Sequence, residues 1–263
     1  KRVLITGANS YIGTNVEKWL NKYPDKYFVD TVDMIGDEWR QKNFSDFDVV
    51  FHVAAIVHQR EKPKMKDLYF KVNRDLAIEV AKKAKEAGVS QFIFMSTMAV
   101  YGEEGKIGQN VIIDKNTPVN PKTLYGKSKL EAEKGLNKLK CDRFKVVILR
   151  PPLIYGPNCP GNYARLEKLS VKLPVFPMID NKRSMLNINK LCQYIKEYID
   201  NEVDGVFFPQ DEEYVNISLL VKELAKMNGK SIYLSKTAGL IIKLIGKRVS
   251  LFNKIFGNLV YDK

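Results

Sequence analysis

The stretch Val3-Leu4-Ile5-Thr6-Gly7-Ala8-Asn9-Ser10-Tyr11-Ile12-Gly13 decides the fold. A short apolar run ends in a glycine turn, and residues 11–22 then continue with helical spacing. This order predicts a strand, a tight turn and a helix whose N-terminal N–H groups point at a bound diphosphate. Gly7 permits the turn, and Gly13 allows the helix to pack closely on the strand. Ser10 replaces the middle glycine of the usual motif, and its hydroxyl can donate a hydrogen bond to phosphate.

The same alternation of strands and helices extends to about residue 150. Further short apolar runs with little alternation lie at Tyr27–Val32, Val49–Val53, Gln91–Met95 and Lys145–Leu149. Longer segments with helical spacing lie at Tyr11–Lys22, Lys66–Ala87 and Thr123–Leu139. Because strands buried on both faces have such continuous apolar runs, the sequence predicts an α/β fold with a Rossmann-type, doubly wound parallel sheet.

The composition of the sequence and the length of its helical segments change after Arg150. Prolines occur at positions 151, 152, 157, 160, 174 and 177, and the helical segments become shorter. We therefore predict a dinucleotide-binding Rossmann domain over residues 1–150. Residues 151–263 would form a smaller C-terminal substrate-binding lobe, interleaved with the last strands of the sheet. Within it, Ala238–Phe256 is basic and amphipathic; we expect a helix packed on the lobe, with a membrane-surface helix as the alternative.

The bulk composition limits the classes of partner. The 263 residues are 45% hydrophobic and 28% charged, and the formal net charge is +13. The lysines are scattered among acidic residues without a long block of cations, so nucleic acid is not the expected partner. No signal-peptide pattern or bilayer-spanning apolar run occurs, so we expect a cytoplasmic protein without membrane insertion. Cys141, Cys159 and Cys192 lack metal-ligand spacing, so neither a metal site nor a disulfide framework is predicted.

The second predicted strand ends at an acidic residue, Asp33. Asp33 follows Gly13 by twenty residues, where a carboxylate accepts hydrogen bonds from the adenosine ribose and repels a 2′-phosphate. No arginine follows immediately, so NAD is favoured over NADP as the cofactor. Asp30 competes for the same role, and either residue could instead be an exposed strand-end acid.

Two side chains with acid/base potential lie in the third predicted helix. Tyr125 and Lys129 are four residues apart and therefore project from one face. The lysine ammonium beside the phenol is expected to lower the pKa of Tyr125 toward a useful range. Upstream, the strand Gln91–Met95 ends at Ser96 and Thr97, and a doubly wound sheet binds its ligands at such strand ends.

The order of glycine loop, strand-end acid, Ser-Thr and Tyr-x-x-x-Lys resembles the short-chain dehydrogenase/reductase superfamily, in its extended branch of nucleotide-sugar epimerases, dehydratases and reductases. Further stretches similar to that family are His52-Val53-Ala54-Ala55, Val72-Asn73 and Arg150-Pro151-Pro152-Leu153-Ile154-Tyr155-Gly156-Pro157. The resemblance covers nearly the whole chain and implies a nicotinamide cofactor and a nucleotide-sugar substrate. It also implies that the helices at 66–87 and 123–139 form the interface of a homodimer.

The resemblance assigns residues to three roles. The catalytic residues it implies are Thr97, Tyr125 and Lys129, with Ser96 as a stand-in for Thr97. The implied cofactor-binding residues are Gly7, Asn9, Ser10, Tyr11, Ile12, Gly13, Asp33, Val53, Ala54, Ala55, Asn73, Lys129 and Pro152. The implied substrate-binding residues are Thr97, Tyr125, Asn162 and Arg183, the arginine clamping the diphosphate. His58 and Arg60 could line the site, although a histidine in such a place is more often structural.

The residues after Thr97 narrow the reaction. Dehydratases of this family carry an Asp-Glu pair there and its combined epimerase–reductases a cysteine, whereas this chain has Met98-Ala99. We therefore expect redox chemistry at C4 of a nucleotide-activated sugar, with UDP as the expected nucleotide, in bacterial-type polysaccharide precursor synthesis. The enzyme would be a C4 epimerase or a 4-keto reductase; the alternative is a non-catalytic NAD(P)-sensing regulator on the same fold. Members of the extended branch usually have longer chains, so a trimmed or truncated substrate lobe is expected.

Overall fold

The computed structural model describes residues 1–57 and 61–263, with the backbone alone at residue 247. The candidate site residues His58 and Arg60 therefore lie outside the described residues. The chain forms two compact units. Unit 1 comprises Lys1–Gly102, Asn120–Pro151 and Ile188–Pro209, and unit 2 comprises Glu103–Val119, Pro152–Asn187 and Gln210–Lys263. A single boundary at residue 150 would place residues 103–119 in unit 1 and residues 188–209 in unit 2. The structure places them the other way round.

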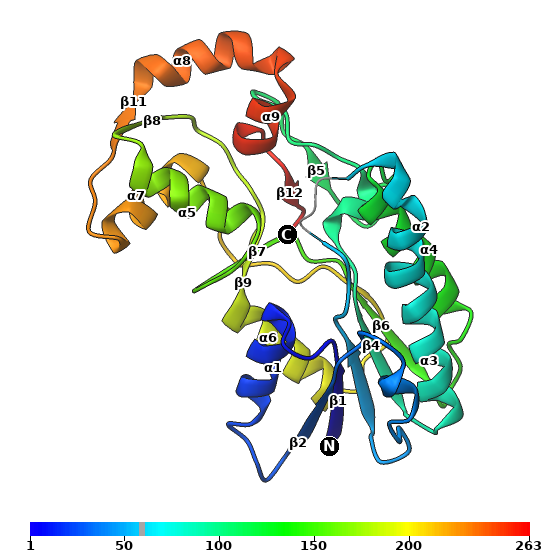
Figure 1. Ribbon diagram of the computed structural model, residues 1–263. Helices are drawn as coiled ribbons and strands as arrows, with labels where there is room; N and C mark the ends of the chain where they lie inside the picture. Colours follow the sequence, from blue (N-terminus) through cyan, green and yellow to red (C-terminus); the bar gives the residue numbers. More distant parts are fainter. Residues whose placement is uncertain (58–60) are drawn as a thin grey trace. The chain divides into compact units, whose positions relative to one another are not determined.

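A six-stranded parallel sheet forms the centre of unit 1 (Figure 1). Its strands are β1 (Arg2–Thr6), β2 (Phe28–Val32), β3 (Val49–His52), β4 (Gln91–Met95), β6 (Lys145–Leu149) and β10 (Gly205–Phe207). They lie in the order β10-β6-β4-β3-β1-β2. The chain runs from β1 to β2 and then returns past β1 to β3, so the strand order reverses next to β1. Ligands of doubly wound sheets bind at such a reversal, beyond the carboxyl ends of the strands.

Helices cover both faces of this sheet. They are α1 (Tyr11–Leu20), α2 (Lys66–Phe70), α3 (Leu76–Glu86), α4 (Leu124–Asn137) and α6 (Ile188–Asp200), with short 3₁₀ segments η1 (Glu38–Arg40), η2 (Pro63–Met65) and η4 (Met98–Tyr101). Figure 1 shows α1 and α6 on one face and α2, α3 and α4 on the other. On the second face, alanines of α3 and α4 allow close approach to buried strand side chains such as Phe92 and Phe94. Because β3 and β4 are buried along their whole length, their apolar runs show no alternation.

The strands and helices predicted for the first half of the chain are confirmed, with one change of detail. β4 and β6 have the predicted bounds. The helix predicted over 66–87 contains a π-helical segment, η3 (Lys71–Asp75), between α2 and α3. Such π segments within helices occur frequently at functional sites, and Asn73 lies in this one.

Unit 2 is built from helices and short parallel strand pairs. The helices are α5 (Asn162–Lys172), α7 (Ile217–Met227), α8 (Lys236–Ile245) and α9 (Ser250–Phe256), with the 3₁₀ segment η5 (Gly246–Arg248). The strand pairs are β5 (Ile112–Ile113) with β12 (Val260–Tyr261), β7 (Leu153–Tyr155) with β9 (Met185–Asn187), and β8 (Val175–Pro177) with β11 (Tyr233–Ser235). Helices α5 and α7 pack together and bury Leu166, Val221 and Leu224.

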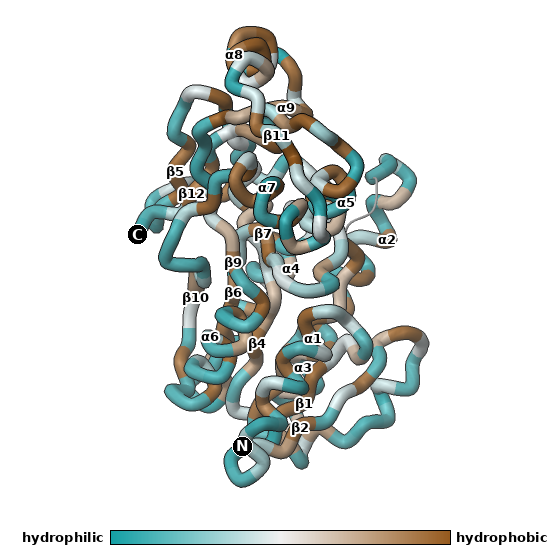
Figure 2. Tube along the Cα trace, turned by 90° about the vertical axis from the view of Figure 1, so that its left-hand side faces the viewer, coloured by the Kyte–Doolittle hydropathy of each residue, from teal (hydrophilic) through white to brown (hydrophobic). Residues whose placement is uncertain are grey.

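The segment Ala238–Phe256, expected as one packed helix, is divided among α8, η5 and α9, and α8 is packed on one side only. Gly239 is buried, and a β-carbon at this position would clash with the carbonyl oxygen of Met178, so the helix backbone rests on that residue. The apolar residues Leu240, Ile241, Leu244 and Ile245 are 61%, 52%, 78% and 56% exposed. Figure 2 shows α8 as a largely hydrophobic segment. The prediction of a packed helix is therefore wrong for this face. Among the described residues, no helix combines the length and apolarity needed to cross a bilayer.

Candidate active site

The glycine loop between β1 and α1 has the geometry of a diphosphate-binding turn. Gly7 has a φ of 109°, and a β-carbon there would lie 2.8 Å from the amide nitrogen of Ala54. Gly13 lies against Ile5 and the Gly7 carbonyl, so its lack of a side chain lets α1 approach β1 as predicted. Ser10 is the N-cap of α1: its Oγ accepts from the Gly13 N–H at 3.1 Å, which leaves the hydroxyl hydrogen for another acceptor.

The loop after β3 lies beside the glycine loop. Successive N–H groups of this loop donate to the Thr6 carbonyl at 3.0 and 3.1 Å. Asn73 is fully buried, and its Oδ1 accepts from the Ile56 N–H at 2.8 Å. Its Nδ2 donates to the Ile56 carbonyl and to Ser128 Oγ, each at 3.1 Å. Since both amide hydrogens are used within the protein, this geometry favours a positioning role for Asn73 over the predicted contact with the cofactor.

The two candidate aspartates of β2 differ in environment. Asp33 is exposed just beyond the strand, and its Oδ1 accepts from the Ile35 N–H at 3.0 Å. Asp30 lies inside β2 with its carboxylate 2.5 Å from Lys42 Nζ. Partial burial alone would raise the pKa of Asp30, but hydrogen bonds from Lys42 and the Thr31 N–H hold it below its usual value. Asp30 is therefore a structural carboxylate, and Asp33 is the acid at the strand end.

Thr97 and Tyr125 are brought together at the carboxyl end of β4. Thr97 is the N-cap of η4, and its Oγ1 accepts from the Ala99 N–H at 3.1 Å. This contact leaves the hydroxyl hydrogen of Thr97 unused, and the hydroxyl lowers the pKa of Tyr125. Burial raises the pKa of the half-buried Tyr125 to about 12, and the hydrogen bond from Thr97 opposes this rise. The hydroxyl of Ser96 donates to Glu133 instead, so Thr97 is the hydroxyl beside the phenol.

Lys129 lies one turn further along α4 and is buried. Its Nζ donates to the Met95 carbonyl at 2.7 Å and lies 4.5 Å from the centre of the Phe94 ring. Burial lowers the pKa of Lys129 to about 7, and the negative charge of Glu133 acts in the opposite direction. The Met95 carbonyl holds the ammonium at the end of β4, and the effect of Lys129 on the pKa of Tyr125 stays a prediction.

A buried ion pair lies behind Lys129 on the same face of α4. Glu133 is 2% exposed and accepts from Arg150 Nε at 3.1 Å and from Nη2 at 2.5 Å. Arg150 Nη1 also donates to the hydroxyl of Tyr101 at 2.9 Å. This arrangement ties α4 to the end of β6 and to η4, and so braces the helix that carries the acid/base pair.

Glu61 and Glu133 are two carboxylates of this site that are missing from the predicted set. Glu61 accepts from the N–H groups of Leu124 and Tyr125 at 2.8 and 3.0 Å, so it caps the N-terminus of α4. Its partners lie 63 and 64 residues further along the chain, and no local pattern indicates the contact. Glu133 does have a signal, because it follows Lys129 by the same four-residue step that joins Lys129 to Tyr125.

Two of the residues predicted to bind substrate, Asn162 and Arg183, lie in unit 2. Asn162 is exposed at the start of α5, directly after Gly161 with its φ of 80°. Arg183 Nη1 donates to the Gly257 carbonyl at 3.1 Å. Burial lowers the pKa of this guanidinium to about 10, and no carboxylate of the described residues offsets the effect. A largely desolvated cation without a carboxylate partner favours an anionic ligand. Pro152 is a buried residue of this unit, at the start of its segment 152–187.

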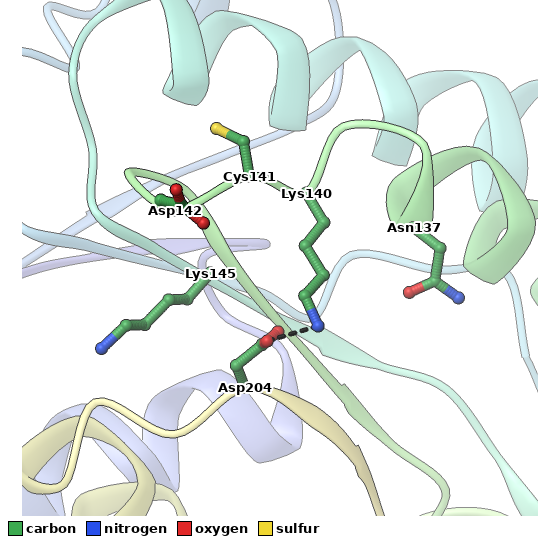
Figure 3. A pocket seen from close by; sticks show the side chains of 6 residues that line it. All are labelled: Asn137, Lys140, Cys141, Asp142, Lys145 and Asp204. Atoms are coloured by element: carbon green, nitrogen blue, oxygen red, sulfur yellow. Dashed lines mark ion pairs between the residues drawn. The ribbon is translucent and has the colours of Figure 1, made fainter.

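A hollow of about 530 Å³ lies at the opposite edge of the sheet (Figure 3). It is lined by Asn137, Lys140, Cys141, Asp142, Lys145 and Asp204. Lys140 and Asp204 form an ion pair across it. These residues precede or begin β6 and β10, at the amino ends of the strands, whereas doubly wound sheets bind ligands at the carboxyl ends. This hollow is therefore separate from the site at Tyr125.

The chain is similar to several known proteins. Residues 3–172 match the family described as "NAD dependent epimerase/dehydratase family". The chain is 32% identical over 288 residues to a UDP-glucose 4-epimerase of Vibrio cholerae, covering 100% of this chain and 87% of the relative. It is 30% identical over 251 residues to the N-acetyl-alpha-D-glucosaminyl-diphospho-ditrans,octacis-undecaprenol 4-epimerase of Escherichia coli O157:H7, covering 88% and 73%. The UDP-glucuronic acid 4-epimerase from Bacillus cereus, solved with NAD, shares the fold with a TM-score of 0.75 at 21% identity, covering 100% and 90%.

Proposed function

The chain belongs to the NAD dependent epimerase/dehydratase family, and on that basis we propose that it is an NAD-dependent C4 epimerase of a UDP-sugar. The observation that carries the proposal is the placement of Tyr125 in the first turn of α4, with Lys129 buried one turn further along and the Thr97 hydroxyl lowering the pKa of the phenol. Two relatives that match 100% and 88% of the chain are named as 4-epimerases, which supports epimerisation over 4-keto reduction.

The residues around β1 suit a dinucleotide. Gly7 has no β-carbon, which lets the backbone of Ala54 lie against the glycine loop, and the N-terminus of α1 offers amides to a diphosphate. The Ser10 hydroxyl hydrogen is left to donate to a phosphate oxygen. Asp33 lies at the end of β2, where a carboxylate would bind the adenosine ribose. These residues would hold NAD. When bound, NAD supplies the acceptor and donor of the hydride exchanged at C4.

Tyr125 is the group that exchanges a proton with the sugar. With a pKa of about 12, the free protein holds it as a phenol. In its phenolate form the oxygen accepts the proton of the 4-hydroxyl as C4 is oxidised to a ketone. Returning that proton to the 4-oxygen after the ketone has presented its other face gives the epimer. Thr97 donates a hydrogen bond to the same oxygen and so favours the phenolate.

The experiment supplies purified protein with UDP-glucose, UDP-N-acetylglucosamine or a UDP-4-keto-6-deoxy sugar, with NAD or NADH. Products are identified by NMR while the absorbance of the reduced nicotinamide is followed. We expect C4 epimers to interconvert without net change in the cofactor, because the hydride leaves and returns within one turnover. Stoichiometric oxidation of NADH with the keto sugar alone would instead establish a reductase. Binding of NAD without any turnover would favour the sensing regulator.

A second candidate substrate is a sugar carried on a polyprenyl diphosphate, the substrate class in the name of the Escherichia coli relative. The observation that favours it is the exposed apolar face of α8. The same NMR assay, run with a detergent-dispersed sugar diphosphate of undecaprenol, separates the two carriers. If only the lipid-linked sugar turns over, the carrier of the sugar is a polyprenyl diphosphate in place of UDP. The proposed chemistry at C4 stays the same.

Replacing Asp33 with alanine is expected to weaken NADH binding by about 10- to 100-fold, the loss that hydrogen bonds to a charged group usually produce. NADPH should lose less, or gain, because the carboxylate no longer repels the 2′-phosphate. Fluorescence titration of both cofactors measures the change. Asp30→Ala is the matched control, since Asp30 is paired with Lys42. A larger loss in the Asp30 variant would reverse the assignment of the two aspartates.

A further inference from the structure

The α8 face, defined as Leu240, Ile241, Leu244 and Ile245, is an apolar surface left open by the fold. At 100° per residue these four side chains occupy an arc of about 140°. Gly239 lies on the other side of the helix, where it meets the backbone of Met178. Contiguous apolar surface of this kind is uncommon on a soluble unit unless it meets a partner or a membrane.

The segment of sequence that carries the α8 face has charges of a single sign. Residues 224–261 contain seven lysine or arginine residues and no aspartate or glutamate. Lys236 and Lys243 are exposed and seven residues apart, so they line one edge of the α8 face. Arg248 is also exposed, and Lys254 forms an ion pair with Glu104 at 3.5 Å. The surface therefore combines apolar side chains with a cationic border.

We propose that the α8 face docks unit 2 on an anionic lipid membrane surface. Leu, Ile and Lys in this arrangement are typical of helices that lie flat in the headgroup region, with apolar side chains inserted and ammonium groups at the phosphates. A second copy of the chain fits less well, because apposed α8 faces would bring Lys236 and Lys243 close to their own equivalents. Helix α8 has ten residues, which suits a surface helix and is too short to span a bilayer.

The test is cosedimentation of the full chain with vesicles, and it needs neither substrate nor cofactor, so it is independent of the proposed function. We expect binding to phosphatidylglycerol/phosphatidylcholine vesicles and at least about tenfold weaker binding to phosphatidylcholine alone or at high salt. Ile241→Ser with Leu244→Ser removes half of the α8 face, and Lys236→Glu with Lys243→Glu reverses its border. Each pair should weaken binding by at least about tenfold.

Matched controls lie on α7 of the same unit. Met227→Ser removes a side chain that is 79% exposed, and Lys222→Glu reverses an exposed charge; both should bind like the wild type. Melting temperatures establish that all variants fold. A wild type that stays in the supernatant with anionic vesicles overturns the proposal, as does an equal loss in the controls. A dimer in sedimentation velocity that Leu244→Ser dissociates, without vesicle binding, would show that a second copy covers the face.

Discussion

Replacing Tyr125 with phenylalanine is expected to lower kcat for sugar epimerisation by about 10²- to 10⁴-fold, the usual contribution of a positioned acid/base group. The substitution removes the phenol oxygen, whose pKa the Thr97 hydroxyl lowers, and keeps the aromatic ring in the first turn of α4. No other phenol takes its place, because the neighbouring Tyr69 is 1% exposed and buried under α4. NMR of the sugar products under saturating substrate measures the loss.

The controls for Tyr125→Phe separate chemistry from folding and binding. Affinity for the sugar nucleotide and the melting temperature should stay close to the wild-type values, since only one hydroxyl is removed. Tyr198→Phe makes the same chemical change on α6, on the opposite face of the sheet, and should leave kcat unaltered. A Tyr125 variant that keeps more than about a tenth of the wild-type kcat would mean that another group exchanges the proton with the 4-hydroxyl.

Local patterns in the sequence were sufficient to locate five strands of the sheet and the glycine loop, but not β10. β4 is buried along both faces, so its five residues form an unbroken apolar run with the observed bounds. The stretch Val3–Gly13 indicates a strand, a turn and a helix in that order. Its apolar run suits a buried strand, Gly7 suits the turn, and Gly13 suits a helix packed closely on the strand. The step of four residues between Tyr125 and Lys129 likewise places both on one face of α4.

Features that depend on distant segments could not be predicted in the same way. Glu61 caps α4 across more than sixty residues, and Asn73 uses its amide hydrogens on Ile56 and Ser128. The position of the Lys129 ammonium depends on the Met95 carbonyl that accepts its hydrogen bond, and this contact is set by the tertiary fold. Helical spacing alone also does not tell which side of an amphipathic helix meets the protein, as α8 shows.

Replacing Glu133 with alanine is expected to lower the free energy of unfolding by about 3–5 kcal/mol, the usual cost of leaving one partner of a buried ion pair. The Arg150 side chain is 13% exposed and would keep its charge without the carboxylate that now accepts three of its hydrogen bonds. Ser96 would lose the acceptor of its hydroxyl as well. Chemical denaturation followed by circular dichroism measures the change. Glu131→Ala on the same helix is the control, because its exposed pair with Lys134 contributes at most about 0.5 kcal/mol.

The ion pair between Glu133 and Arg150 can also be tested for an effect on Lys129. Glu133→Leu combined with Arg150→Met should recover most of the lost stability, since an apolar pair removes both buried charges. The pKa of Lys129 should still change, because the charge of Glu133 now raises it and its loss lowers it further below about 7. The ammonium then loses its proton at lower pH. As the positive charge of Lys129 favours the Tyr125 phenolate, the alkaline limb of the kcat/KM profile should move to lower pH in the double variant and stay in place with Glu131→Ala. A stable double variant with the wild-type profile would assign the ion pair to stability alone.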